Sequence, residues 1–232
     1  MDEHVAAGFR AKGQIPSRVR SFKGLYSIPY GCYCSKNIKN LMMAGRNISA
    51  SKLAMGSTRV MGTCAIGGEA VGIAAAQAVK YGLSPRTYGQ KHIRDLQQLL
   101  LKNDCYLIGL KNEDPGDLAR TAIVTASSER SGYAAAKVIN GIARNTDSED
   151  NLWVSNGLST EGETLRLSLA QPAKLSQVRL TFDPNLSEER CISVSKAFIE
   201  KEPVGVACEL VKDYVVRLVR EGCLVSETAI SG

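Results

Sequence analysis

Two stretches of sequence decide the fold of the first half of the chain: NLMMAGRNISA at residues 40–50 and GSTRVMGTCAIGGEAVGIAAA at residues 56–76. The first begins with apolar residues and reaches a glycine, which predicts a short buried strand over residues 40–45 followed by a loop. In the second, alanine, valine and isoleucine dominate without a proline, and Gly82 lies just beyond. This pattern predicts a helix over residues 63–80 that ends at a C-terminal glycine.

A second helix is predicted over residues 87–102. Its apolar residues recur at helical spacing, and they are Ile93, Leu96, Leu99 and Leu100. One apolar stripe on an otherwise polar helix indicates that one face is buried. We therefore expect this helix to dock against the rest of its domain.

The residues around the start of the first predicted helix are candidates for contact with an anion. A helix N-terminus leaves backbone N–H groups unpaired and carries about half a positive charge. Gly45 and Gly62 leave room for a flat or phosphorylated ligand against the backbone, and Arg46 and Arg59 would add charge-assisted hydrogen bonds. Two interpretations stay open at this point: a contact surface for a nucleotide cofactor, and a small-residue packing helix behind a tight turn.

Positive charge is concentrated near the N-terminal end. Residues 1–60 hold ten Lys and Arg against Asp2 and Glu3, a balance of +8, so the other 172 residues carry −2 of the total of +6. A phosphate-bearing cofactor or nucleic acid would suit this excess, and a solvated basic face is the third interpretation. Aromatic residues make up only 6% of the chain and no nucleic-acid motif is present, so no nucleic-acid partner is expected.

The overall composition, with 44% hydrophobic and 22% charged residues in 232, is that of a globular chain of one or two domains. The most apolar stretch, residues 65–79, is interrupted by Glu69 and Gln77, so no membrane span is expected. Seven scattered cysteines (32, 34, 64, 105, 191, 208 and 223) predict reduced, buried thiols rather than a disulfide framework. Only two of them are close in sequence and the two histidines are far apart, so no metal site is expected.

The quoted stretches resemble the C-terminal FAD-contact segment of FAD-dependent oxidoreductases, in particular a bacterial group known by that name. The tail of that family reads like NLLVAGRCISA followed by RVMPTCMALGQAAGTAAALA. Upstream, YSIPY at residues 26–30 resembles the family's IPYR, with Gly31 in place of the arginine, and Gly62 stands where a proline is common. The resemblance covers residues 20–105.

This resemblance implies FAD as the cofactor, and hydride transfer between a small organic substrate and the flavin in the full-length protein. The segment Ala44, Gly45, Arg46 and Asn47 would lie beside the ribityl-pyrophosphate chain. The helix start, with Val60, Met61, Gly62, Thr63 and Cys64, would face the pyrimidine edge of the flavin, where its dipole would stabilise the anionic reduced form. Arg59 completes the candidate cofactor-binding set, and no catalytic residue is assigned.

The family's other FAD element, a strand followed by G-x-G-x-x-G and a helix, has no counterpart in this sequence. The glycines Gly67, Gly68 and Gly72 have a different spacing and fall inside a predicted helix. A βαβ unit of more than about 30 residues does not fit upstream of residue 40. We therefore expect residues 1–112 to be the C-terminal segment of a larger FAD-dependent oxidoreductase, a fragment that is inactive alone.

Residues 1–112 are basic and rich in Gly, Met and Ala, whereas the residues after the turn-forming run at 112–117 read as short β segments. A second domain is therefore expected over residues 120–232. Short strands separated by turns favour an antiparallel β-sandwich there, incomplete in this chain. The segments that read as strands are residues 151–155, 164–169, 175–182 and 214–219. The expected class is therefore α+β: a partial FAD-binding segment of short strand, small-residue helix and docking helix, then the sandwich.

Residues 134–144, Asn151-Leu152-Trp153 and the segments 164–169 and 178–183 resemble a discoidin-type, galactose-binding-like β-sandwich. Asn140-Gly141 stands where many relatives have Asp-Gly. Relatives bind sugars or surfaces through loops, so the resemblance implies an alternative function: a non-catalytic module that binds carbohydrate or a protein partner. Trp153 is either a sugar platform or a core residue, and such folds favour the core.

Overall fold

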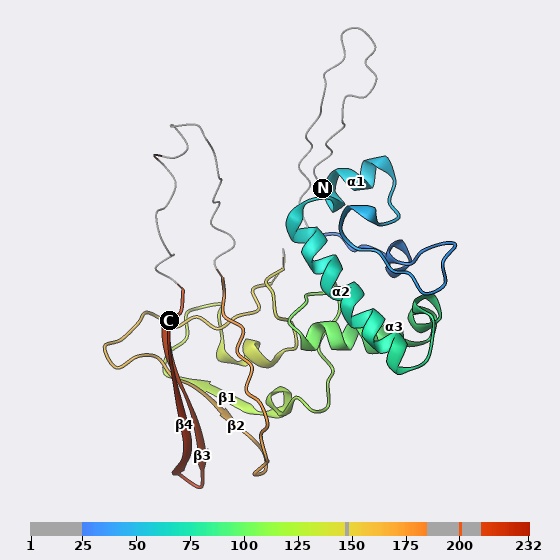
Figure 1. The fold of residues 1–232 in the computed structure, drawn as a ribbon. Coiled ribbons are helices and arrows are strands. Elements are labelled where there is room, and N and C mark those ends of the chain that lie inside the picture. Colours follow the sequence, from blue (N-terminus) through green and yellow to red (C-terminus); the bar gives the residue numbers. More distant parts are fainter. Residues whose placement is uncertain (1–24, 147–148, 185–199, 201–209) are drawn as a thin grey trace.

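A computed structural model describes residues 25–146, 149–184, 200 and 210–232. It has a helical half and a half built from small sheets, and Figure 1 shows them on opposite sides of the molecule. The helical half contains α1 (Lys52–Thr58), α2 (Met61–Lys80) and α3 (Pro85–Lys102). The other half contains β1 (Ile123–Ala126), β2 (Leu165–Ser168), β3 (Asp213–Arg220) and β4 (Cys223–Ser231). The described part is thus mixed α and β, as expected.

Short 3₁₀ turns join these elements: η1 (Tyr30–Tyr33), η2 (Gly45–Asn47), η3 (Leu118–Thr121) and η4 (Ala135–Ile139). Within the described part of the chain, no helix is long and apolar enough to cross a membrane.

The helix α2 confirms the small-residue helix and begins two residues before the predicted start. Its end is a Schellman motif. The N–H of Gly82 donates to the carbonyl of Val79 at 3.0 Å, and that of Leu83 donates to Ala78 at 2.9 Å. Gly82 has φ +63°, in the left-handed region that favours glycine.

The helix α3 packs against α2, and their contact forms a buried cluster of Ala74, Ala78, Tyr88, Leu96 and Leu100. The predicted stripe of α3 is confirmed, since Leu96 and Leu100 are buried and Ile93 and Leu99 are half-buried. The alanines of α2 leave space for a large ring, and Tyr88 is fully buried against them. The prediction of a docking helix is therefore correct.

Two predictions for residues 40–60 are wrong. The expected buried strand over residues 40–45 is reduced to one antiparallel bridge between Cys34 and Met42, because no described neighbour pairs with the rest of that segment. The expected loop after it contains α1. This helix forms because the Ser51 Oγ accepts a hydrogen bond from the N–H of Ala54 at 3.2 Å, which caps its first turn.

The second half contains two separate two-stranded antiparallel sheets, β1–β2 and β3–β4. The predicted strands over residues 164–169 and 214–219 are confirmed as β2 and β3, whereas residues 151–155 and 175–182 form no ladder in the described structure. Residues 175–182 keep their period-two alternation without a backbone partner there, so alternation alone did not establish pairing. The sandwich stays a prediction.

The turn-forming run between the two halves is fixed to α3. The Gln98 side chain donates to the carbonyl of Lys111 at 3.0 Å and accepts from the N–H of Glu113 at 2.7 Å. Lys102 and Asp114 form an ion pair at 2.7 Å. The proposed division of the chain near residue 115 thus falls in a segment that the last turns of α3 hold in place.

Candidate functional site

The turn η2 carries the first group of candidate residues. Ala44 is extended, Gly45 has φ +74°, and Arg46 and Asn47 are exposed. A residue with a side chain would be strained at this φ, so the glycine is required by the turn itself. The turn therefore presents its arginine and asparagine side chains to solvent.

Flanking residues hold η2 in position. The N–H of Met43 donates to the carbonyl of Tyr33 at 2.9 Å, and that of Ser49 donates to Cys32 at 2.8 Å. Ile48 is buried directly after the turn. Both α1 and α2 pack against η2, so the structure brings the first candidate group close to the helix that carries the second.

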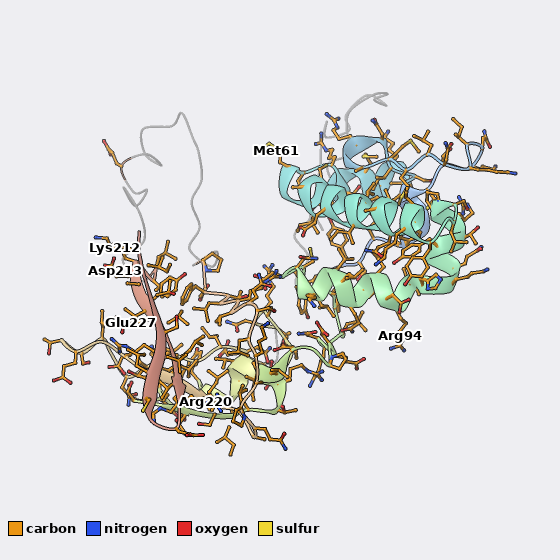
Figure 2. All side chains as sticks on the ribbon, turned by 60° about the horizontal axis from the view of Figure 1, so that its bottom comes forward. Met61, Arg94, Lys212, Asp213, Arg220 and Glu227 are labelled. Carbon is orange, nitrogen blue, oxygen red and sulfur yellow. The ribbon has the colours of Figure 1, made fainter. Side chains whose placement is uncertain are left out.

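The second group lies at the start of α2, which is open. Val60 occupies the N-cap position and makes no side-chain hydrogen bond to the helix. Met61 is 89% exposed and Val60 48% exposed, and no heavy atom lies within 4 Å of the place where a Cβ on Gly62 would stand. Figure 2 shows the Met61 side chain at the tip of the helix, away from the rest of the molecule. The unpaired N–H groups of this first turn are therefore accessible to a ligand.

The next residues of the helix are half-buried. Thr63 and Cys64 lie on the side of α2 that turns toward the protein. The Cys64 thiol donates to the carbonyl of Thr58 at 3.5 Å, so it is directed at the end of α1. Only the first part of the predicted group, Val60 to Gly62, faces solvent.

Three exposed cations lie on the elements that precede this helix start. They are Arg46 on η2, Lys52 at the first residue of α1 and Arg59 at the C-cap of α1. No acidic residue stands between Glu3 and Glu69 in the sequence. The local field is therefore positive and adds to that of the helix dipole. Lys52 is not among the predicted site residues, because residues 51–58 were expected to form a loop and not α1.

The glycines of the helical half fall into two kinds. A Cβ on Gly67 would meet the Tyr33 ring at 3.0 to 3.4 Å, and one on Gly89 would meet the Tyr30 ring at 2.2 Å. Gly62, Gly68 and Gly72 face open space instead. Gly67 is therefore small because a ring packs against it, as the interpretation of α2 as a packing helix expects. Gly62, at the start of α2, has no ring packed against it. Burial of the two tyrosines raises the pKa of each hydroxyl.

The cysteines offer no metal or disulfide chemistry among the described residues. Five are free, namely Cys32, Cys34, Cys64, Cys105 and Cys223. The prediction of buried thiols is confirmed for Cys34 and wrong for Cys223, which is exposed on β4. The other three described thiols are half-buried, and Cys191 and Cys208 lie outside the described residues. Burial, together with a hydrogen bond to Glu69, raises the pKa of Cys105 to about 12. The described residues hold no group of three His, Cys, Asp or Glu side chains that could bind a metal ion.

Comparison with known proteins agrees with the first resemblance. Residues 1–100 match the family model described as FAD dependent oxidoreductase, and residues 117–200 match a domain of unknown function. No curated protein and no solved structure matches the chain. The first part of the chain is therefore similar to FAD-dependent oxidoreductases, a class whose cofactor is FAD and whose substrates are small molecules. The family matched by residues 117–200 has no assigned function, so the discoidin-type resemblance stays a prediction.

Proposed function

We propose that residues 1–112 form the C-terminal segment of an FAD-dependent oxidoreductase domain, which closes over the cofactor. The observation that carries this proposal is the open, uncapped start of α2 beside η2, with exposed cations on η2 and at the C-cap of α1. The cofactor-contacting residues are Ala44, Gly45, Arg46, Asn47, Arg59, Val60, Met61, Gly62, Thr63 and Cys64.

The residues present fit an anionic, flat cofactor. Arg46 and Arg59 would pair with phosphate oxygens, and the N–H groups at the start of α2 would donate to the electron-rich pyrimidine edge. Gly62 would let the ring system approach the backbone, since no Cβ stands in the way. When bound, FAD supplies the hydride acceptor or donor for a small organic substrate. The positive helix end would stabilise negative charge on the reduced ring system.

The chain does not hold the whole of such a site. None of its 232 residues forms a G-x-G-x-x-G, so the segment that binds the adenosine must come from elsewhere in the functional protein. We therefore expect no oxidoreductase activity from these residues alone.

Flavin binding by the full-length protein tests the proposal. Arg46→Ala and Arg59→Ala should each weaken FAD binding about 10-fold, because a hydrogen bond to a charged group contributes about 1.5–3 kcal/mol. Lys36→Ala is the matched control, since Lys36 is an exposed cation on the loop before Met42 and not part of the proposed site. Flavin fluorescence quenching on titration gives the dissociation constants. Equal affinities for all three variants and the unmodified protein would contradict the assignment.

We propose a ligand-binding role for the second half as the alternative function. An open groove with a volume of about 500 Å³ lies between residues 177–180 and the β3–β4 hairpin, and Tyr214, Ser226 and Thr228 are in its lining. A groove of this size has room for a small ligand such as a sugar. Trp153 is a poor sugar platform, because its ring N–H donates to the carbonyl of Ser128 at 2.9 Å within the domain. Binding of glycans to an array, lost in Tyr214→Ala, would support this alternative, and absence of binding would remove it.

A further inference from the structure

The extended segment at residues 177–182 lies between the end of α3 and the β3–β4 hairpin. Two of its side chains reach the end of α3: the Arg179 guanidinium donates to the carbonyl of Lys102, and Thr181 Oγ1 lies 2.9 and 3.0 Å from the two carboxylate oxygens of Asp104. Toward the hairpin, residues 177–180 line an open groove, and the Phe182 ring lies 5.1 Å from that of Tyr214.

The residue at the end of α3 is unusual for its position. Asp104 has φ +73°, and it occupies the place in the Schellman motif where glycine is the usual residue. The N–H of Asp104 donates to Leu101 at 3.1 Å, and that of Cys105 donates to Leu100 at 3.0 Å. An aspartate here is strained where a glycine would not be. Only a residue with a side chain can also accept the hydrogen bond from Thr181.

We propose that residues 177–182 are a strap that clamps the C-terminal half of the chain onto the C-terminal end of α3. Arg179 adds a positive charge at the negative end of the helix, beside one of its last carbonyls. The hydrogen bond between Thr181 and Asp104 fixes which residues of the segment meet the helix end, and the Phe182 ring contacts Tyr214 of the hairpin. The strap thus joins three elements that are far apart in sequence.

A second attachment lies on the same helix end. The Lys102–Asp114 ion pair and the Gln98 hydrogen bonds fix the connecting segment to the last turns of α3. Both attachments meet the same end of α3, one at the carbonyl of Lys102 and the other at its side chain, so two chain segments hold the C-terminal half there. Opening of the end of α3 and release of the C-terminal half are therefore coupled. Because α2 and α3 share a buried core, α2 is coupled to the same opening. This inference is independent of cofactor binding.

Hydrogen exchange of the full chain tests the strap. The amides of Asn103, Asp104 and Cys105 are bonded to carbonyls of the last turns of α3, and their exchange reports the opening of that end. Arg179→Ala and Thr181→Val should each speed their exchange about 10-fold, as expected for loss of a hydrogen bond to a charged or helix-terminal group. Arg94→Ala is the control, because Arg94 is exposed on the same helix (Figure 2).

A double-mutant cycle gives a second, independent measurement. Asp104→Gly removes the acceptor and suits the left-handed region, and it is combined with Thr181→Val in chemical denaturation. Coupling between the two substitutions supports the strap, and strict additivity overturns it. Unchanged exchange in Arg179→Ala, or an equal acceleration in Arg94→Ala, also overturns it. If Arg179→Ala does not fold, the cycle alone decides.

Discussion

The two long helices of the first half begin in opposite ways. The first turn of α3 is closed: Ser84 caps it by accepting from the N–H of Thr87 at 3.2 Å, and Pro85 occupies its first position. The first turn of α2 has no side-chain cap, and Val60 and Met61 are exposed there. A serine, threonine or aspartate before a helix is enough to cap it. The uncapped and exposed start of α2 therefore keeps N–H groups that a ligand can bind, at the expense of helix stability.

The glycines of the two helices also differ in what surrounds them. Gly89 on α3 is required by packing, because the Tyr30 ring lies against it and the Tyr30 hydroxyl donates to the carbonyl of Pro85 at 2.8 Å. Gly62, Gly68 and Gly72 on α2 meet nothing. The helix α3 is thus built for internal packing along its length, whereas α2 keeps an unfilled surface. Substitutions matched between the two helices should separate these roles.

The largest effect is expected from alanine in place of glycine. Gly89→Ala should lower the free energy of unfolding by about 1–3 kcal/mol, because its Cβ would overlap the Tyr30 ring. Gly72→Ala should raise it by about 0.5–1 kcal/mol, since alanine favours the helix and the space is open. Denaturant unfolding of both variants measures the pair. A loss of stability in Gly72→Ala would show that α2 is as tightly packed as α3.

A smaller effect is expected from exchanging the caps. Ser84→Ala should cost about 1 kcal/mol, because the N–H of Thr87 loses its acceptor. Val60→Asp should stabilise α2 by about 1 kcal/mol, since aspartate both caps a helix and suits its positive end. In the full-length protein the same substitution should weaken FAD binding, because the carboxylate would take the N–H groups and repel the phosphates. Stability and affinity that rise together in Val60→Asp would contradict the proposed site.

Local sequence patterns predicted the parts of this molecule that local interactions determine. The helices α2 and α3 follow from apolar spacing and from the glycine at the end of α2. The strand over residues 40–45 was wrong because a ladder needs a partner that no local pattern reveals. The same reason explains residues 175–182, which alternate in sequence but form no ladder and contact α3 and the hairpin through side chains instead.

The candidate site was predictable only in part for the same reason. The sequence predicted both of its elements and two of the three cations. The Tyr30 and Tyr33 contacts, which separate packing glycines from open ones, join residues distant in sequence and leave no periodic signal. Lys52 was not predicted because α1 has only seven residues and no apolar stripe, so its sequence resembles a loop.

The smallest expected effect concerns the ion pair at the end of α3. The hydrogen bond from Lys102, with further help from the N–H of Gly116, lowers the pKa of Asp114 below its usual value. A carboxyl whose pKa is lower in the folded state stabilises the fold above its unfolded pKa of about 3.9, and this stabilisation is lost as the pH falls through the folded pKa. Because Lys102 is largely exposed, the contribution should be less than about 1 kcal/mol.

The variant Lys102→Met keeps the aliphatic stem and removes the charge, so it isolates this contribution. Its free energy of unfolding should lie below that of the unmodified protein from pH 5 to 7, and the two should converge as the pH falls below 4. Lys91→Met, an exposed position on the same helix, is the control and should show no such convergence. A difference that stays constant down to pH 2 would mean that Lys102 stabilises the helix end through its stem. The stability of the C-terminal end of α3 would then depend on packing and on the strap, not on charge.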